Sequence, residues 1–299
     1  MTNALLNWIF APGFFQSEQV RNALLLGGMA AAVCGVLGVF VVIRNQAFVG
    51  HAVADFGGAG AALAFLLGVN TLWGFLLFGL LSAAGVELLG KRAKERDLAT
   101  GVVLSSALGL EALFLFLDTH YTGSAGAPMM ILFGSIFMVR PSTVAIVAGM
   151  SCGALLILCA VYRPLLLCSL DPELAGTRGV PVRLVGLVFI LILAIVVEEA
   201  SLAAGALMGT ALLIGPAAAA TRLTHKMGAA LLISSVIGLF SMWLGILLAY
   251  DSYFWPPAHR GWPVSFFVCI LLLAIYLLSG LPGRRPARGK CTLEVAEHA

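Results

Sequence analysis

Long apolar runs separated by short polar segments dominate the chain. A helix needs roughly 20 mainly apolar residues to cross the hydrocarbon core of a bilayer. Runs of about that length occur at 22–43, 46–69, 71–90, 98–117, 142–162, 184–203, 205–222, 227–249 and 263–281. The run 127–138 is too short for a full span, so we expect it to be re-entrant or a buried half-helix.

The pattern therefore predicts an all-α, polytopic helical membrane bundle with about eight transmembrane helices and one short re-entrant or half-helix segment. A β-barrel is not expected, because its strands show alternating segments of about ten residues. We divide the chain into an N-terminal interfacial helix at 1–21, a transmembrane permease domain at 22–281 and a tail at 282–299. The N-terminus lacks a basic region and a cleavage site, so it does not resemble a signal peptide.

Composition excludes several classes of protein. Of the 299 residues, 61% are hydrophobic and only 10% are charged, whereas a soluble domain carries about 25% charged residues. A soluble enzyme, a disordered chain and a disulfide scaffold are excluded on this ground. The net charge of +3 is too small to indicate a nucleic-acid partner.

Lysine and arginine are concentrated in a few segments, which sets the expected orientation. Basic residues mark 91–97, 163–183, 222–226 and the tail, and such segments face the cytoplasm. The C-terminus is then cytoplasmic and the N-terminus lies outside a plasma membrane that the chain crosses several times. Arg140 is an exception, because this topology places it near the outer face, where it could snorkel.

His51 and Asp55 lie between two apolar spans, in a stretch with no real loop. They are four residues apart, so a helix places them on one face. Ionisable residues at membrane depth indicate function by default, and imidazole with carboxylate suits a divalent transition metal. The alternative is an interfacial pair at a helix start that binds no ligand.

Three glutamates are further candidates. Glu111 lies in the middle of a span, and Glu198 and Glu199 lie toward the predicted outer end of theirs. Each could contribute a metal ligand or an outer gate. The alternative is that they lie near an interface or are hydrogen-bonded to a neighbouring helix.

The segment 170–182 is too polar to cross the membrane. Asp171 is suited to cap a short helix with Pro172 at its first position. Glu173 lies in the first turn, where the helix dipole favours it, and Gly179 can end the helix. This short helix could dock on another protein, or it could be a connecting loop that happens to be helical.

Four stretches, taken in order, resemble the permease subunit of the ABC-3 family of metal importers. They are FVVIRNQAFVGHAVADFGGAGAALAFLLG, RDLATGVVLSSALGL, LFGSIFMV, and LDPELAGTRGVPV followed by GALMGTALLIGPAAAATRL. The resemblance covers roughly 20–281. It implies a homodimer with two cytoplasmic ATPases and an extracytoplasmic metal-binding protein. The chain has no GxxxxGK[ST] motif, so we do not expect it to be the ATPase itself; we expect a transport subunit rather than an enzyme.

The resemblance also carries over to individual residues. Asp171 and the spacing of Glu173, Ala175 and Gly179 resemble the coupling helix that docks on the ATPase. The family usually has Gly-Asp-x-x-x-His in the first stretch, where Asp and His bind metal in transit. Here His51 and Asp55 hold those positions in reversed order.

We therefore expect a permease that imports a divalent metal by alternating access, with no permanently bound cofactor. His51 as a ligand favours Zn²⁺, and Mn²⁺ comes next. The expected ligands are His51 and Asp55, with Glu198 and Glu199 as further candidates. The rival functions are a permease for a metal chelate, siderophore or vitamin, an ATPase-independent secondary transporter, and a membrane-embedded enzyme.

Overall fold

The computed structural model describes residues 14, 16–89, 93–121, 126–134, 136–255 and 261–280. Within these ranges every regular element is helical. The elements are α2 (Glu18–Ile43), α3 (Ala47–Leu66), α4 (Thr71–Leu89), α5 (Ala93–Tyr121), α6 (Ala127–Phe133), η1 (Ile136–Met138), α7 (Pro141–Leu170), α8 (Pro172–Thr177), α9 (Val182–Ala204), α10 (Ala206–Leu223), α11 (Met227–Ser252) and α12 (Val264–Ser279).

The helices confirm the predicted membrane bundle. In the described part of the chain, seven helices are long and apolar enough to cross a membrane: α2, α3, α5, α7, α9, α10 and α11. Two shorter apolar helices correspond to α4 and α12. The predicted N-terminal interfacial helix and the tail lie largely or wholly outside the described residues, as do Lys91 and Arg92 of the basic segment.

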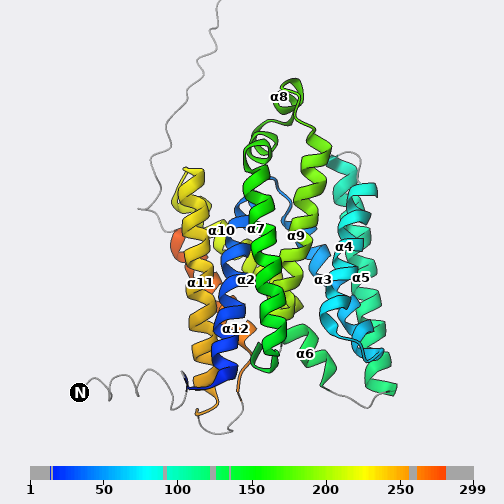
Figure 1. The fold of residues 1–299 in the computed structure, drawn as a ribbon, viewed down its shortest axis with the longest axis vertical. Coiled ribbons are helices and arrows are strands. Elements are labelled where there is room, and N and C mark those ends of the chain that lie inside the picture. Colours follow the sequence, from blue (N-terminus) through cyan, green and yellow to red (C-terminus); the bar gives the residue numbers. More distant parts are fainter. Residues whose placement is uncertain are drawn as a thin grey trace, which may run out of the picture.

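The segment 127–138 does not cross the bundle. It forms the seven-residue helix α6 and the three-residue helix η1, and seven helical residues extend only about 10 Å. The end of α5 and the start of α7 lie at the same end of the bundle (Figure 1). The expected half-helix is therefore present.

One boundary differs from the expectation. The predicted polar loop starts at 163, but α7 continues as far as Leu170 with Pro164 inside the helix. A proline costs a helix one backbone hydrogen bond and usually bends it. The polar connection that remains contains α8, which projects from the end of the bundle where α7 stops and α9 starts (Figure 1).

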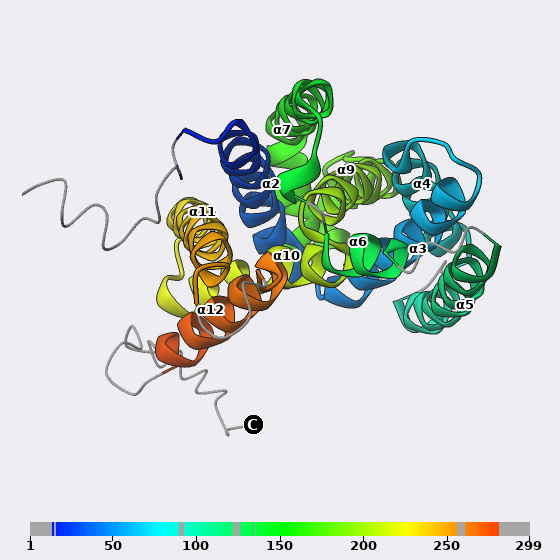
Figure 2. The same ribbon diagram turned by 90° about the horizontal axis from the view of Figure 1, so that it is seen from below.

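Helices α2, α9 and α10 form the centre of the bundle, with α3, α4 and α5 on one side and α11 and α12 on the other, and α7 packs against α2 and α9 at the outer edge (Figure 2). Glycines allow the closest helix contacts, as is common in lipid. A Cβ at Gly35 of α2 would lie 2.7 Å from the Cα of Ser235 on α11. One at Gly74 of α4 would lie 2.7 Å from the carbonyl carbon of Gly60 on α3.

Two chain breaks meet at the end of the bundle opposite α8. Gly134 follows α6 with φ +80°, and Gly205 separates α9 from α10 with φ +92°. Both values favour glycine, which has no Cβ. A Cβ at Gly205 would lie 2.6 Å from the nitrogen of Gly134, so the two backbones are in direct contact.

Candidate metal centre

His51 and Asp55 lie on one face of α3, as their spacing predicts. The His51 Nε2 atom is 3.6 Å from the Asp55 Oδ2 atom. The His51 side chain is 42% exposed and the Asp55 side chain is 8% exposed. The His51 imidazole therefore lies partly at the surface, and the Asp55 carboxylate next to it lies in the interior of the bundle. Its role as a pair of metal ligands remains a prediction.

The exposed side of His51 borders an open groove of about 440 Å³ between α3, α10 and α12. The groove is mainly apolar, and its other lining residues include Thr210, Gly215, Cys269 and Tyr276. Thr210 and Tyr276 add hydroxyl groups to the imidazole. A cation at His51 would consequently meet few polar groups on the groove side and more on the Asp55 side.

Two glutamates approach α3 next to Asp55. The carboxylate of Glu198 on α9 packs against Gly57 of α3 and Gly79 of α4. The Glu111 Oε1 atom on α5 would be 2.9 Å from a Cβ at Gly58. The charges of Glu111 and Glu198 lie close enough to Asp55 to interact with it. We refer to Asp55, Glu111 and Glu198 as the acidic cluster.

The acidic cluster is buried, and several of its carboxylate oxygens have no hydrogen-bond partner among the described residues. Glu198 is 1% exposed and Glu111 is 5% exposed. Neither carboxylate oxygen of Glu198, nor Oε1 of Glu111, has a hydrogen-bond partner among the described residues. Such groups are costly at membrane depth unless a cation or a proton accompanies them. The arrangement can therefore attract and bind a cation inside the bundle.

The cluster does not form a closed ligand cage. Across the ranges that the structure describes, no group of three or more His, Cys, Asp or Glu residues is arranged to hold a metal ion. Resident structural metals usually have four protein ligands in place. The acidic cluster is therefore not a preformed four-ligand site within the described part of the chain.

Glu199 lies apart from the cluster, although it follows Glu198 directly. Its Oε2 atom accepts a hydrogen bond of 2.6 Å from the Ser151 hydroxyl on α7. Consecutive residues of a helix point about 100° apart, so Glu198 faces α3 and α4 while Glu199 faces α7. The structure brings only Glu198 of this predicted pair toward Asp55. Neither residue's role as a metal ligand is tested by this placement.

Sequence reasoning did not connect Glu111 with Asp55. The signal was present in Gly57 and Gly58, which follow Asp55 on the same helix. They remove the side chains that would otherwise keep both glutamates away from α3. The partners of these glycines are distant in sequence, so only the packing identifies them.

The polar connection after α7 forms the predicted short helix. The Asp171 Oδ1 atom accepts hydrogen bonds of 3.0 Å from the backbone N–H groups of Glu173 and Leu174. The helix ends at Thr177, and Gly179 has φ +79°. Ala175 is fully buried while Asp171, Glu173 and Gly179 are exposed. The predicted cap is confirmed, and docking on an ATPase remains a prediction.

Arg44 joins the start of α3 to the helices that carry α8. Its Nη1 group donates to the Ser169 hydroxyl near the end of α7 at 3.4 Å. Its Nε group donates to the Gln46 side chain at 3.3 Å. The guanidinium also lies over the Phe189 ring of α9, 5.2 Å from its centroid. A shift of α7 or α9 at this end would therefore act directly on the beginning of α3.

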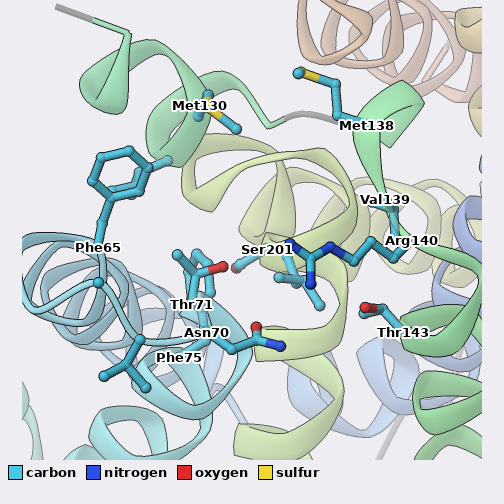
Figure 3. Close-up of a pocket in the computed structure, with 14 residues that line it drawn as sticks. Phe65, Asn70, Thr71, Phe75, Met130, Met138, Val139, Arg140, Thr143 and Ser201 are labelled. Carbon is cyan, nitrogen blue, oxygen red and sulfur yellow. The ribbon is translucent and has the colours of Figure 1, made fainter. Parts of the chain in front are cut away.

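A second cavity, of about 420 Å³, lies at the end of the bundle opposite α8. Figure 3 shows the residues that line it. Arg140, the exception in the predicted topology, reaches into it from the start of α7. The residues across the cavity include Asn70 and Thr71 at the start of α4 and Ser201 on α9. We call this cavity the Arg140 pocket.

Comparison with known proteins agrees with these features. Residues 16–278 match the family described as ABC 3 transport family. The chain is 31% identical over 243 residues to the manganese import system permease protein ScaB of Streptococcus parasanguinis, covering 81% of this chain and 85% of that protein. It is 29% identical over 237 residues to the manganese transport system membrane protein MntC of Halalkalibacterium halodurans, covering 78% and 79%.

A solved structure has the same fold. It is PsaBC from Streptococcus pneumoniae in complex with Fab, with a TM-score of 0.78 and 25% identity. The alignment covers 94% of this chain and 96% of the other. The match therefore extends over nearly the whole length of both chains.

Proposed function

Since this chain belongs to the ABC 3 transport family and is the membrane permease of an ABC transporter rather than its ATPase, we propose that it carries a divalent transition metal into the cytoplasm. The observation that carries this proposal is the unsatisfied, buried acidic cluster that continues inward from the His51–Asp55 pair. A cation would supply the partners that these oxygens lack.

Mn²⁺ is the metal that we propose first. Relatives of this chain are named for manganese transport. Carboxylate oxygens suit manganese, whereas imidazole also suits zinc, and the cluster adds Glu111 and Glu198 to Asp55. The sequence-based preference for Zn²⁺ depends on the imidazole of His51, whose Nε2 atom lies 3.6 Å from the Asp55 Oδ2 atom. Zn²⁺ is therefore the second candidate.

The ion would move by exchange between incomplete ligand sets. The His51–Asp55 pair would replace part of its hydration shell, and Glu198 would hold it on the side nearer the α6 end of the bundle. A site of this kind binds weakly enough to release its ion, which conduction requires. Carboxylates on three different helices, α3, α5 and α9, allow the ligand set to change when those helices shift.

ATP-driven movement would enter through α8. We propose that α8 docks on a cytoplasmic ATPase through the surface around Asp171, Glu173 and Gly179. Movement of α8 would shift the ends of α7 and α9, and Arg44 would pass that shift to α3. The cavity around the acidic cluster would then open alternately to the two sides of the membrane.

The proposed complex contains a second copy of this chain, two ATPase subunits and an extracytoplasmic metal-binding protein. The similarity to PsaBC from Streptococcus pneumoniae supports assembly with other subunits. The basic residues Arg178 and Arg183 near α8 support a cytoplasmic position for that end. The N-terminus would then lie outside and the C-terminus inside.

The test is metal uptake by vesicles that contain the permease with its ATPase. ATP-dependent accumulation of radioactive Mn²⁺ is expected, and His51→Ala and Asp55→Ala should each abolish it while the ATPase still co-purifies. Gly109→Ala is a matched control, because no atom lies within 4 Å of a Cβ there. Normal uptake by both site variants would refute the site. A preference for Zn²⁺ in competition would replace manganese with the second candidate.

A further inference from the structure

Arg222 joins the ends of α10 and α12. It lies in the last turn of α10, and its Cζ atom is 3.7 Å from the centroid of the Tyr276 ring on α12. The Arg222 Nη2 group also donates a hydrogen bond to the Tyr276 hydroxyl. A Cβ at Gly280, the residue after α12, would lie 3.0 Å from the Arg222 Nη1 atom. One side chain thus contacts both the tyrosine and the end of α12.

The surroundings of Arg222 favour a positive charge. Helix C-termini carry partial negative charge, and α10 ends at Leu223 while α12 ends at Ser279. A guanidinium over an aromatic ring gains a cation–π attraction, and its planar shape allows it to stack and to donate hydrogen bonds together. Arg222 itself is exposed. These contacts, rather than burial, therefore hold its guanidinium over Tyr276.

Tyr276 also lines the open groove of about 440 Å³ between α3, α10 and α12, which we call the His51 groove. Helix α10 runs from Gly205 toward the α8 end of the bundle, and its last residue in the groove lining is Ala218. Arg222 follows Ala218 by four residues, which is about one helical turn. Arg222 therefore lies at the α8 end of the His51 groove, and its contact with Tyr276 sets the position of the groove wall there.

The His51 groove offers a cation no acidic partner on the way to Arg222. Among the described residues, the polar side chains of its lining are His51, Thr210, Cys269 and Tyr276, with no aspartate or glutamate. A guanidinium held at the end of an otherwise apolar passage is an electrostatic barrier to cations. A cation at His51 thus has the carboxylate of Asp55 on one side and a positive charge ahead of it on the other.

We infer that Arg222 is a positioning residue that holds Tyr276 at the α8 end of the His51 groove and bars this end to cations. The inference rests on the proposed import of a divalent metal, in which the ion leaves His51 toward the cytoplasm. The barrier opens when the ends of α10 and α12 separate, because the ring contact and the hydrogen bond both join these two helices. Until then, an ion at His51 stays beside the acidic cluster.

Cys269 is a free thiol in the groove lining, so its modification reports which charges reach the groove. Vesicles that expose the α8 end and contain the permease with its ATPase, without nucleotide, are treated with a cationic or an anionic methanethiosulfonate reagent. Peptide mass spectrometry then measures the rate of modification at Cys269 alone. Arg222→Gln should raise the ratio of the cationic to the anionic rate about tenfold, because a fixed charge changes the local concentration of ions of each sign. A wild-type ratio in Arg222→Gln would overturn the inference, since mere loosening of the helices raises both rates alike.

Two further variants separate position from charge. Lys226→Gln is the matched control, because Lys226 is an exposed cation just after α10 and is not part of the groove lining; it should keep the wild-type ratio. Tyr276→Leu keeps the charge of Arg222 but removes the ring and the hydroxyl that hold it, so the ratio should rise. Arg222→Gln should add little to that rise in the Tyr276→Leu background. An unchanged ratio in Tyr276→Leu would refute positioning through the tyrosine.

The labelling assay requires no transport, so it is independent of the proposed import function. If vesicles with the wild-type complex imported no Mn²⁺, metal import would be refuted, whereas the effect of Arg222→Gln on the labelling ratio would still decide whether the barrier exists. If the complex does import Mn²⁺, Arg222→Gln should also let Mn²⁺ pass without ATP. Uptake by that variant that depends on ATP as strictly as in the wild type would count against the barrier.

Discussion

The packing of Glu198 against Gly79 leads to a specific prediction for Gly79→Ala. A Cβ at Gly79 would lie 2.6 Å from the Glu198 Cγ atom and 2.8 Å from its Cδ atom. Carbon atoms in contact are normally about 3.5–4.0 Å apart. The glutamate has little room to move away, because it is fully buried and also packs against Gly57. The substitution should therefore displace Glu198 or separate α4 from α9.

The expected cost is the difference between two effects. Overpacking of a tight interior costs about 1–3 kcal/mol, and alanine in place of glycine within a helix returns up to about 1 kcal/mol. A net loss of about 1–2 kcal/mol is expected. The three atoms nearest to the added Cβ all belong to Glu198. In a Glu198→Ala background, Gly79→Ala should consequently cost little, although transport should remain impaired.

Thermal unfolding of the purified complex measures the loss of stability, and manganese uptake by vesicles measures transport. Gly85→Ala is the matched control on α4, because the nearest atom to its Cβ is 4.0 Å away. That variant should be as stable as wild type or more stable, and it should transport normally. If Gly79→Ala matched Gly85→Ala in both assays, Glu198 would not occupy the position that the structure gives it. If Gly79→Ala destabilised the chain equally in the wild-type and Glu198→Ala backgrounds, the added methyl group would be in conflict with a residue other than Glu198.

Three further predictions concern the connections of the site. Asp171→Ala removes both cap hydrogen bonds of α8 and should cost about 1 kcal/mol of local stability. Hydrogen exchange in α8 should become faster, and less ATPase should co-purify. Unchanged hydrogen exchange would contradict the capping role of Asp171. Arg44→Gln should preserve Mn²⁺ affinity and ATPase association but lower the number of ions moved per ATP hydrolysed. If the number of ions per ATP equalled that of the wild type, Arg44 would not lie on the coupling route. Ser151→Ala removes a buried donor to Glu199 and should destabilise the chain by about 1–3 kcal/mol, as thermal unfolding would show. The Mn²⁺ affinity of that variant should not change, and a weakened affinity would place Glu199 on the metal path.

Features of the fold that depend on local sequence were predictable. The length of each apolar run determines whether a helix can cross the membrane. The runs correspond to the seven long helices and the two shorter apolar helices of the described chain, with 127–138 correctly separated from them. The cap of α8 by Asp171 also depends only on neighbouring residues. The end of α7 was predicted too early, because the basic residue Arg163 marks the start of the predicted polar segment, whereas the helix continues past it to Leu170 with Pro164 inside.

The site was predictable only in part. His51 and Asp55 share a helix face because of their spacing, and the structure has them 3.6 Å apart. The separation of Glu198 from Glu199 depends on how α9 is rotated against its neighbours, which the periodicity of an apolar helix does not determine. Glu111 meets α3 through contacts between segments far apart in the chain. The assignment of all these residues to metal binding remains a prediction that the uptake assays address.

The contact between Gly134 and Gly205 makes two interruptions of the chain into a single joint. Helices α9 and α10 cannot change their angle at Gly205 without carrying α6 and η1 with them. Since Ser201 and Met130 on either side of this joint also line the Arg140 pocket, that pocket would deform with every such movement. A change of angle between α9 and α10 would therefore also change the spacing of α4, α6 and α7 around that pocket, so the α6 end of the bundle would rearrange as one unit.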